Sequence, residues 1–172
     1  MIPKIKKILY ATDLSKNSSY AFRYAVNSAK RHGAEVIILH VIEEIGESAR
    51  SILQAYLDPK YIEEKSKENI TYVKDRINQR LSVFYDKIRA EEPEFEDTKV
   101  STVLCVGYPA EEILRQADKL DCDAIVMGTH GKGLLGHTFL GSVTKRVLRR
   151  TRKPVFIIPL PKEESDLTYH DI

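Results

Sequence analysis

Residues 36–42 read VIILHVI, an almost continuous run of aliphatic and β-branched side chains. A strand with one face in water alternates apolar and polar residues, whereas a strand covered on both faces is apolar throughout. The run therefore predicts a buried strand of a parallel sheet with helices on both faces.

Similar strand signals recur along the chain and alternate with apolar residues at helical spacing. Further strands are expected at residues 5–12, 100–106, 124–127 and 155–158. Helices are expected around residues 21–29, 70–90, 109–117 and 142–148. The order β-α-β-α-β-α-β-α-β predicts a single α/β domain over residues 1–160, and sheets of this kind bind ligands at the carboxyl ends of their strands.

Two segments do not follow this alternation. Residues 43–67 are acidic and are interpreted as a longer, irregular and mobile connection, with a small helix at the apolar cluster of residues 52–57. Residues 161–172 form an acidic tail that is expected to be disordered. The long helix at residues 70–90 has apolar side chains every 3.6 residues on average, which is typical of a straight helix lying on a sheet.

The chain of 172 residues carries 27 basic and 25 acidic side chains, a formal net charge of +2. A charge so near zero argues against a nucleic-acid or membrane-surface protein, and no apolar run is long enough to span a bilayer. The two cysteines lie far apart, which indicates reduced thiols and a cytoplasmic location. The charge is unevenly spread, however, because residues 124–161 contain seven basic and no acidic side chains.

Five of the eight glycines lie inside this acid-free stretch, at residues 128–141. They connect a predicted strand to a helix that opens at Ser142. Glycine lets backbone N–H groups approach phosphate oxygens closely, and a helix N-terminus attracts negative charge. A single glycine would be explained by a tight surface turn, but five together favour an anion-binding loop.

Two familiar phosphate-binding motifs do not describe this loop. Residues 131–136 match the dinucleotide pattern GxGxxG, but that pattern follows the first strand and needs an acidic residue about 20 positions later. No acidic residue occurs between Asp123 and Glu163. The P-loop pattern GxxxxGK[ST] fails because Leu134 stands where lysine is required.

The spacing that remains is G-x2-G-x9-G-S over residues 128–142, and a polar segment, ATDLS, follows the first strand at residues 11–15. With LHV at residues 39–41 and PVFIIP at residues 154–159, these segments resemble the universal stress protein family, specifically its ATP-binding branch. The resemblance covers about residues 3–160. It implies a five-stranded, Rossmann-like sheet of the adenine nucleotide alpha hydrolase type, with strand order 3-2-1-4-5.

The resemblance also implies a nucleotide site for ATP, ADP or AMP with Mg²⁺ or Mn²⁺. Its phosphates would be held by backbone amides and one hydroxyl, those of Gly128, Gly131, Gly141, Ser142 and Val143. The main chain of Val41 would contact the adenine. Asp13 and Thr12 would lie near the ribose and phosphates, with the cation bound through Asp13.

Four further residues complete the implied site. Met127 would pack at the base of the cleft, and Ala11 would lie beside the adenine, where many family members have proline. Lys132 would compensate the phosphate charge. His130 is a polar loop residue within reach of a γ-phosphate, with no sign that it acts as a general base.

Several of these residues have a purely structural interpretation as well. Asp13 or Ser15 would cap the first helix, Val41 would be an ordinary buried strand residue, and Ser142 would be an ordinary N-cap. The loop offers no carboxylate that could activate a nucleophile, so no catalytic residue is assigned.

Three functions follow from these interpretations. The leading hypothesis is an ATP-binding regulatory protein that acts as a stress-response switch or sensor. The second is a slow nucleotide hydrolase or phosphotransferase that uses Mg²⁺ on Asp13. The third is an interaction module in which the nucleotide is incidental, with Tyr72 and Tyr85 as candidate contacts to an unknown protein partner. The apolar strand at residues 155–158 is expected at a sheet edge, and the resemblance suggests a homodimer that pairs there. The alternative is that the tail at residues 160–172 folds over this strand.

Overall fold

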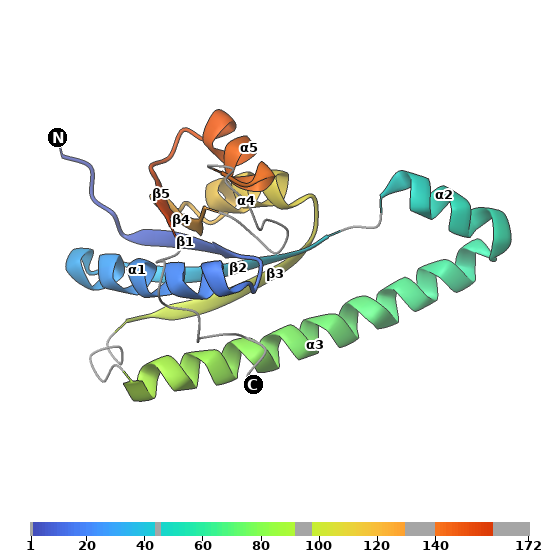
Figure 1. Cartoon of the computed structure of the whole chain (residues 1–172), viewed down its shortest axis with the longest axis horizontal. Helices are drawn as coiled ribbons and strands as arrows, with labels where there is room; N and C mark the ends of the chain where they lie inside the picture. Colours follow the sequence, from blue (N-terminus) through green and yellow to red (C-terminus); the bar gives the residue numbers. More distant parts are fainter. Residues whose placement is uncertain (1, 44–45, 92–97, 130–139, 160–172) are drawn as a thin grey trace.

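The computed structural model describes residues 2–43, 46–91, 98–129 and 140–159. Five strands form one parallel sheet in the order β3-β2-β1-β4-β5, which confirms the predicted topology (Figure 1). The strands are β1 (Lys7–Thr12), β2 (Glu35–Glu43), β3 (Val100–Gly107), β4 (Ala124–Gly128) and β5 (Val155–Ile158). The acidic tail predicted at residues 161–172 lies outside the described residues.

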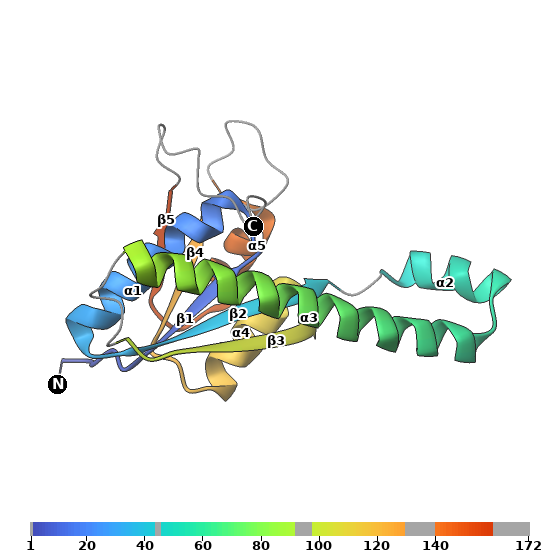
Figure 2. The same cartoon turned by 90° about the horizontal axis from the view of Figure 1, so that it is seen from below.

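Helices cover both faces of this sheet (Figures 1 and 2). One face is covered by α1 (Lys16–His32) and α3 (Pro59–Glu91), and the other by α4 (Pro109–Lys119) and α5 (Ser142–Arg150). Two layers of helix leave both sides of the central strands without water, as the apolar strand sequences require.

Alternation along β2 shows why its sequence is apolar throughout. Val36 and Ile38 point to the layer of α1 and α3, whereas Ile37 and Leu39 point to the layer of α4 and α5. Successive side chains of a strand face opposite sides, so burial on both sides needs an apolar residue at every position.

The stretch expected as an irregular connection is mostly helical. The small helix is confirmed as α2 (Glu47–Tyr56), but α3 begins at Pro59 and is 33 residues long. Asp58 stabilises its first turn, because the Asp58 Oδ1 atom accepts a hydrogen bond from the backbone N–H of Lys60 at 2.8 Å. Pro59 suits the first position of the helix, where its missing N–H would have no partner.

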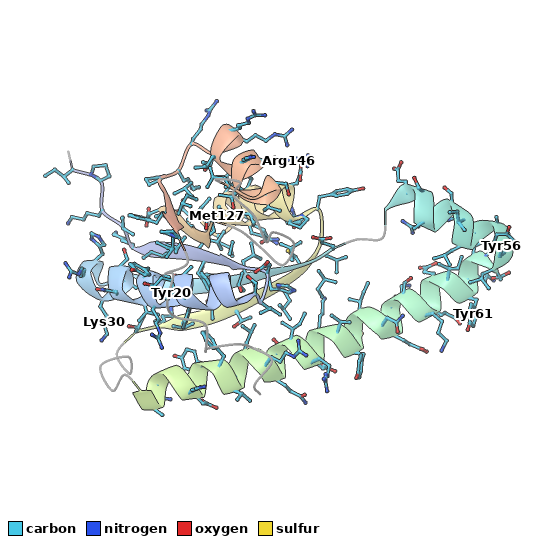
Figure 3. All side chains as sticks on the ribbon, in the orientation of Figure 1. Tyr20, Lys30, Tyr56, Tyr61, Met127 and Arg146 are labelled. Atoms are coloured by element: carbon cyan, nitrogen blue, oxygen red, sulfur yellow. The ribbon has the colours of Figure 1, made fainter. Side chains whose placement is uncertain are left out.

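Residues 47–69, which we call the arm, extend beyond the sheet (Figure 1). No residue of α2 is buried. Tyr56 and Tyr61, labelled in Figure 3, lie at the end of the arm farthest from the sheet and are 84% and 51% exposed. The part of α3 that lies on the sheet is shorter than predicted.

The apolar face predicted for the long helix is therefore only partly buried. Ile77, Leu81 and Phe84 belong to the core, whereas Val73 is exposed where α3 leaves the sheet. The side chain of Ile88 lies outside the described part of the chain. Within the described ranges, no helix has the length and apolar character needed to cross a membrane.

Candidate functional site

A cleft of about 990 Å³ opens at the carboxyl ends of the strands. Its size falls within the range of about 300–1,000 Å³ that is usual for small-molecule sites. Nine of the twelve residues predicted for the nucleotide site line it: Ala11, Thr12, Asp13, Val41, Met127, Gly128, Gly141, Ser142 and Val143. The other three, His130, Gly131 and Lys132, lie outside the described residues.

The turn between β1 and α1 forms one wall of the cleft. The Thr12 Oγ1 atom accepts a hydrogen bond from the backbone N–H of Leu14, and the Asp13 Oδ1 atom accepts one from Ser15, both at 3.0 Å. Leu14 has a φ of +63°, a left-handed conformation that costs about 1–2 kcal/mol for a residue with a side chain. Strained residues of this kind cluster at functional sites. Asp13 thus closes the turn that precedes α1 and also lines the cleft.

A hydrogen bond from the His40 side chain joins the carboxyl ends of β1 and β2. The Nδ1 atom of His40 lies 2.7 Å from the carbonyl oxygen of Thr12, and the side chain is buried. A carbonyl oxygen can only accept a hydrogen bond, so Nδ1 carries the proton. Sequence reasoning assigned no role to His40, although it is the only polar residue in the run VIILHVI. It holds Thr12 beside the strand that carries Val41.

The base of the glycine loop is closed by backbone hydrogen bonds. The N–H of Gly141 donates to the carbonyl of Thr129 at 2.8 Å, and the N–H of Thr129 donates to the carbonyl of Ile158 at 3.1 Å. The buried hydroxyl of Thr144 donates to the carbonyl of Gly128 at 3.2 Å. These bonds place the end of β4 directly beside the start of α5.

Ser142 is the first residue of α5 and not its N-cap, so the interpretation of this residue as an ordinary cap is wrong. The N-cap is Gly141, and no side chain makes a capping bond there. Ser142 is exposed and lines the cleft. The first turn of a helix leaves N–H groups without helical partners and carries partial positive charge. The cleft therefore has a hydroxyl and a helix N-terminus on the same side.

Two basic side chains of α5 form ion pairs with α4 and do not face the cleft. Arg150 and Arg146 contact the Glu111 carboxylate of α4, with Nη1 to Oε1 distances of 3.0 and 3.5 Å. Neither arginine lines the cleft. The charged residues that do line it, among the described residues, are Asp13, Glu43, Arg76 and Arg80. The two arginines belong to α3 and were not predicted.

The described residues contain no group of three or more histidine, cysteine or acidic side chains that could hold a metal ion. Mg²⁺ needs no such group, because it retains water and is often bound by one carboxylate together with the phosphates of a nucleotide. Asp13, at the edge of the cleft, fits that arrangement.

The fold and the cleft define a doubly wound parallel α/β protein with its ligand site at the carboxyl edge of the sheet. A family model described as the universal stress protein family matches residues 4–159. The chain belongs to the universal stress protein family.

Individual relatives agree with this assignment. Universal stress protein MJ0577 of Methanocaldococcus jannaschii is 34% identical over 155 residues, which cover 89% of this chain and 94% of that protein. The solved structure of MJ0577 has a TM-score of 0.73 at 32% identity and covers 92% of this chain and 99% of its own.

Two more distant solved structures share the fold. A universal stress protein in complex with cAMP has a TM-score of 0.58 at 19% identity, with 91% of this chain and 98% of that chain covered. The universal stress protein from Archaeoglobus fulgidus in complex with dAMP has a TM-score of 0.53 at 23% identity, with 92% and 99% covered.

Proposed function

We propose that this chain is a regulatory protein that binds an adenine nucleotide in the cleft and acts as a stress-response switch or sensor. One observation carries the proposal. Residues assigned to a nucleotide site from four separate segments, at the ends of β1, β2 and β4 and the start of α5, line a single cleft. The cAMP and dAMP complexes of the two distant proteins support an adenine nucleotide at the level of the fold.

The phosphate end of this ligand would lie against Gly128, Gly141 and Ser142. That side of the cleft combines the α5 N-terminus with the Ser142 hydroxyl, and both favour an anion. The adenine would lie toward Val41, a buried residue of β2, and would contact its main chain. ATP bound with Mg²⁺ or Mn²⁺ is the form that we propose, with Asp13 on the cation.

The bound cation would neutralise phosphate charge, and Asp13 would orient it. The Asp13 Oδ1 atom already accepts a hydrogen bond from the backbone N–H of Ser15. This arrangement supports binding more directly than catalysis, because fast phosphoryl transfer requires a positioned base.

A homodimer through β5 is part of the proposal. β5 is an edge strand, paired only with β4 among the described strands. Phe156 is 40% exposed on it. An exposed apolar edge strand is a template for pairing with another strand, and a second copy of the chain would cover it.

An interaction role has one observation in its favour, the exposed apolar side chains of the arm. Ile52 and Tyr56 are both exposed there. The two tyrosines singled out from the sequence behave differently. Tyr72 lines the cleft, and Tyr85 is half-buried against the core.

Calorimetric titration with ATP, ADP, AMP and GTP, with and without Mg²⁺, tests the proposed function. Adenine nucleotides should bind at one site per chain. Gly141→Val should remove binding, because the added side chain would block the approach of phosphate to the backbone. Gly46→Val is the matched control, since a Cβ atom at Gly46 has nothing within 4 Å. A wild-type chain that binds no adenine nucleotide would overturn the proposal.

A further inference from the structure

The cleft extends onto the face of the sheet that α3 covers, away from the proposed adenine and phosphate contacts. Val41 and Met127, which are proposed to contact the nucleotide, belong to the core on the side of α4 and α5. Six residues line the cleft on the α3 side, and we call this part the α3 groove: Leu14, Ile42, Val73, Arg76, Ile77 and Arg80. The groove is therefore a second surface of the same cleft.

The two arginines of the α3 groove have no anionic partner among the described residues. Arg76 and Arg80 are four residues apart, so they lie one above the other on the same face of α3. Arg80 is half-buried, and neither side chain forms an ion pair or hydrogen bond with a residue that the structure describes. Glu43 also lines the cleft, and the two arginines outnumber it. A charge that is partly removed from water is stabilised by an opposite charge, so the groove favours an acidic occupant.

The tail of the chain, residues 161–172, has the composition that the groove favours. It contains one basic side chain, Lys162, and four acidic ones, those of Glu163, Glu164, Asp166 and Asp171. In an extended segment Glu164 and Asp166 lie on the same side, about 7 Å apart. Arg76 and Arg80 are separated by about 6 Å along the helix axis. Two carboxylates of the tail therefore match the spacing of the two guanidinium groups.

The tail is also long enough to reach the groove. β5 ends at Ile158, at the carboxyl edge of the sheet where the cleft opens. β4 and β1 lie between β5 and β2, so three strand spacings, about 15 Å, separate Ile158 from the end of β2. An extended chain covers about 3.3–3.6 Å per residue, so Glu164 can lie about 20 Å from Ile158.

The way from β5 to the groove passes the N-terminus of α1, which follows the central strand β1. A helix N-terminus carries partial positive charge, and the first turn of α1 contains no acidic residue. This end of the molecule therefore attracts an acidic segment along the whole distance. Pairing of β5 with a second copy would use the edge of that strand and would leave its end free.

We propose that residues 161–172 dock in the α3 groove of their own chain, with Glu164 and Asp166 paired to Arg76 and Arg80. The docked tail brings negative charge to the cleft and so lowers its affinity for an anionic nucleotide. The docking does not depend on the proposed nucleotide site. The competition rests on that site and would make the tail an internal regulator of it.

A nitroxide spin label on the tail of the full chain tests the docking. Ser165→Cys carries the label, in a chain where Cys105 is replaced by serine and Cys122 is buried. Nuclear magnetic resonance then compares amide signals with the label oxidised and reduced. The amides of the α3 groove should lose intensity, whereas those of Arg31 and Leu120, at the opposite edge of the sheet, should not.

Charge reversal assigns the contact to the paired residues. Arg76→Glu/Arg80→Glu should abolish the intensity loss in the α3 groove, and adding Glu164→Arg/Asp166→Arg should restore it. Lys60→Glu/Lys87→Glu is the control, because it reverses the same charge at exposed positions of α3 outside the cleft, and it should leave the intensity loss unchanged. Circular dichroism shows that each variant is folded.

Three results would overturn the docking. The first is an intensity loss in the groove that the reversal of Arg76 and Arg80 leaves unchanged. The second is an intensity loss confined to residues 155–158, which would place the tail on β5. The third is an intensity loss in ¹⁵N-labelled chains without a spin label when they are mixed with unlabelled chains that carry it, because the groove would then hold the tail of a second copy.

Calorimetry with ATP and Mg²⁺ tests the competition separately. Glu164→Gln/Asp166→Asn should bind ATP about threefold or more tightly than the wild type, because two fewer negative charges face the phosphates. Equal affinities would overturn the competition. A wild-type chain that binds no ATP would remove the proposed nucleotide site, whereas the spin-label experiment decides the docking in either case.

Discussion

Ser142 is positioned to contribute to ligand binding while contributing little to the stability of the fold. It lies on the cleft, it is exposed, and it does not cap α5. Ser142→Ala should therefore change the free energy of unfolding by less than about 0.5 kcal/mol. It should weaken ATP binding about tenfold or more, because a hydrogen bond to a charged group contributes about 1.5–3 kcal/mol. Urea unfolding and calorimetry measure the two effects.

Thr144 is the control for Ser142, because its hydroxyl contributes to the stability of the fold. Its hydroxyl is buried and donates to the carbonyl of Gly128. Thr144→Ala should lower the free energy of unfolding by about 1 kcal/mol. Unchanged ATP affinity in Ser142→Ala would remove the Ser142 hydroxyl from the phosphate site.

Asp123 makes stability depend on pH. Its Oδ2 atom accepts hydrogen bonds from the backbone N–H groups of Lys6 at 2.7 Å and Lys7 at 2.9 Å. These bonds stabilise the ionised carboxylate, so its pKa is lower in the folded chain than in the unfolded chain. The stabilisation is fully present above the unfolded pKa and is lost as the pH falls through the folded pKa.

Asp123→Asn should therefore lower the free energy of unfolding at pH 7 by about 1.5–3 kcal/mol. The difference from the wild type should shrink as the pH falls below about 4, where the carboxyl of the unfolded chain begins to take up a proton while that of the folded chain is still ionised. Urea unfolding at a series of pH values checks this. A difference of the same size at every pH would show that the charge of Asp123 is unimportant.

At the scale of the elements, α3 divides into a half that stabilises the fold and a half that does not. Phe84 packs against Phe22 of α1, with ring centroids 5.4 Å apart, whereas Tyr61 in the arm is 51% exposed. Phe84→Ala should lower the free energy of unfolding by about 3–5 kcal/mol. Tyr61→Ala should change it by less than about 0.5 kcal/mol. Similar losses in both variants would mean that the arm is packed against the molecule.

The same helix shows where sequence reasoning stops being sufficient. The strands could be predicted because a strand that is buried on both faces needs apolar residues at nearly all of its positions, and β2 shows this pattern. The first part of α3 has no buried face and so no apolar period. Its ion pairs, Glu63–Lys67 and Lys65–Glu68, both at 2.7 Å, are of the helical i,i+4 and i,i+3 kind. Asp58 followed by Pro59 was the signal that could have located its start.

The candidate site was predictable to the extent that topology determines it. Asp13 follows β1, Val41 lies near the end of β2, and Gly128 ends β4. The carboxyl ends of parallel strands meet at one edge of the sheet. Arg76 and Arg80 could not be found in this way. Their place on the cleft depends on where α3 leaves the sheet, which no local pattern of residues determines.

At the scale of the whole molecule, the net charge is near zero, but the basic residues are concentrated in one part of the chain. The acid-free stretch of residues 124–161 includes the N-terminus of α5, on the cleft, and the basic outer face of the same helix. Arg146, labelled in Figure 3, is one of the exposed basic side chains of α5. Its pairing with Glu111, together with that of Arg150, uses part of the basic excess to hold α5 against α4.

The proposed dimer is also tested at this scale. Phe156→Glu should convert a dimer into a monomer, because it places a charge on the exposed side of β5. Tyr56→Glu is the control, since it places the same charge on an exposed apolar position of the arm. Sedimentation equilibrium gives the mass of each variant. A wild-type monomer, or dissociation caused by Tyr56→Glu alone, would rule out pairing through β5.

The central claim is that an adenine nucleotide occupies the cleft at the carboxyl ends of the strands. The most direct measurement follows the backbone amide signals of the ¹⁵N-labelled chain by nuclear magnetic resonance during titration with ATP and Mg²⁺. The amides of Asp13, Val41, Gly128, Gly141 and Ser142 should shift together, whereas those of Gly46 and Tyr61 in and beside the arm should not. A spectrum that does not change, or shifts confined to residues outside the cleft, would contradict the account.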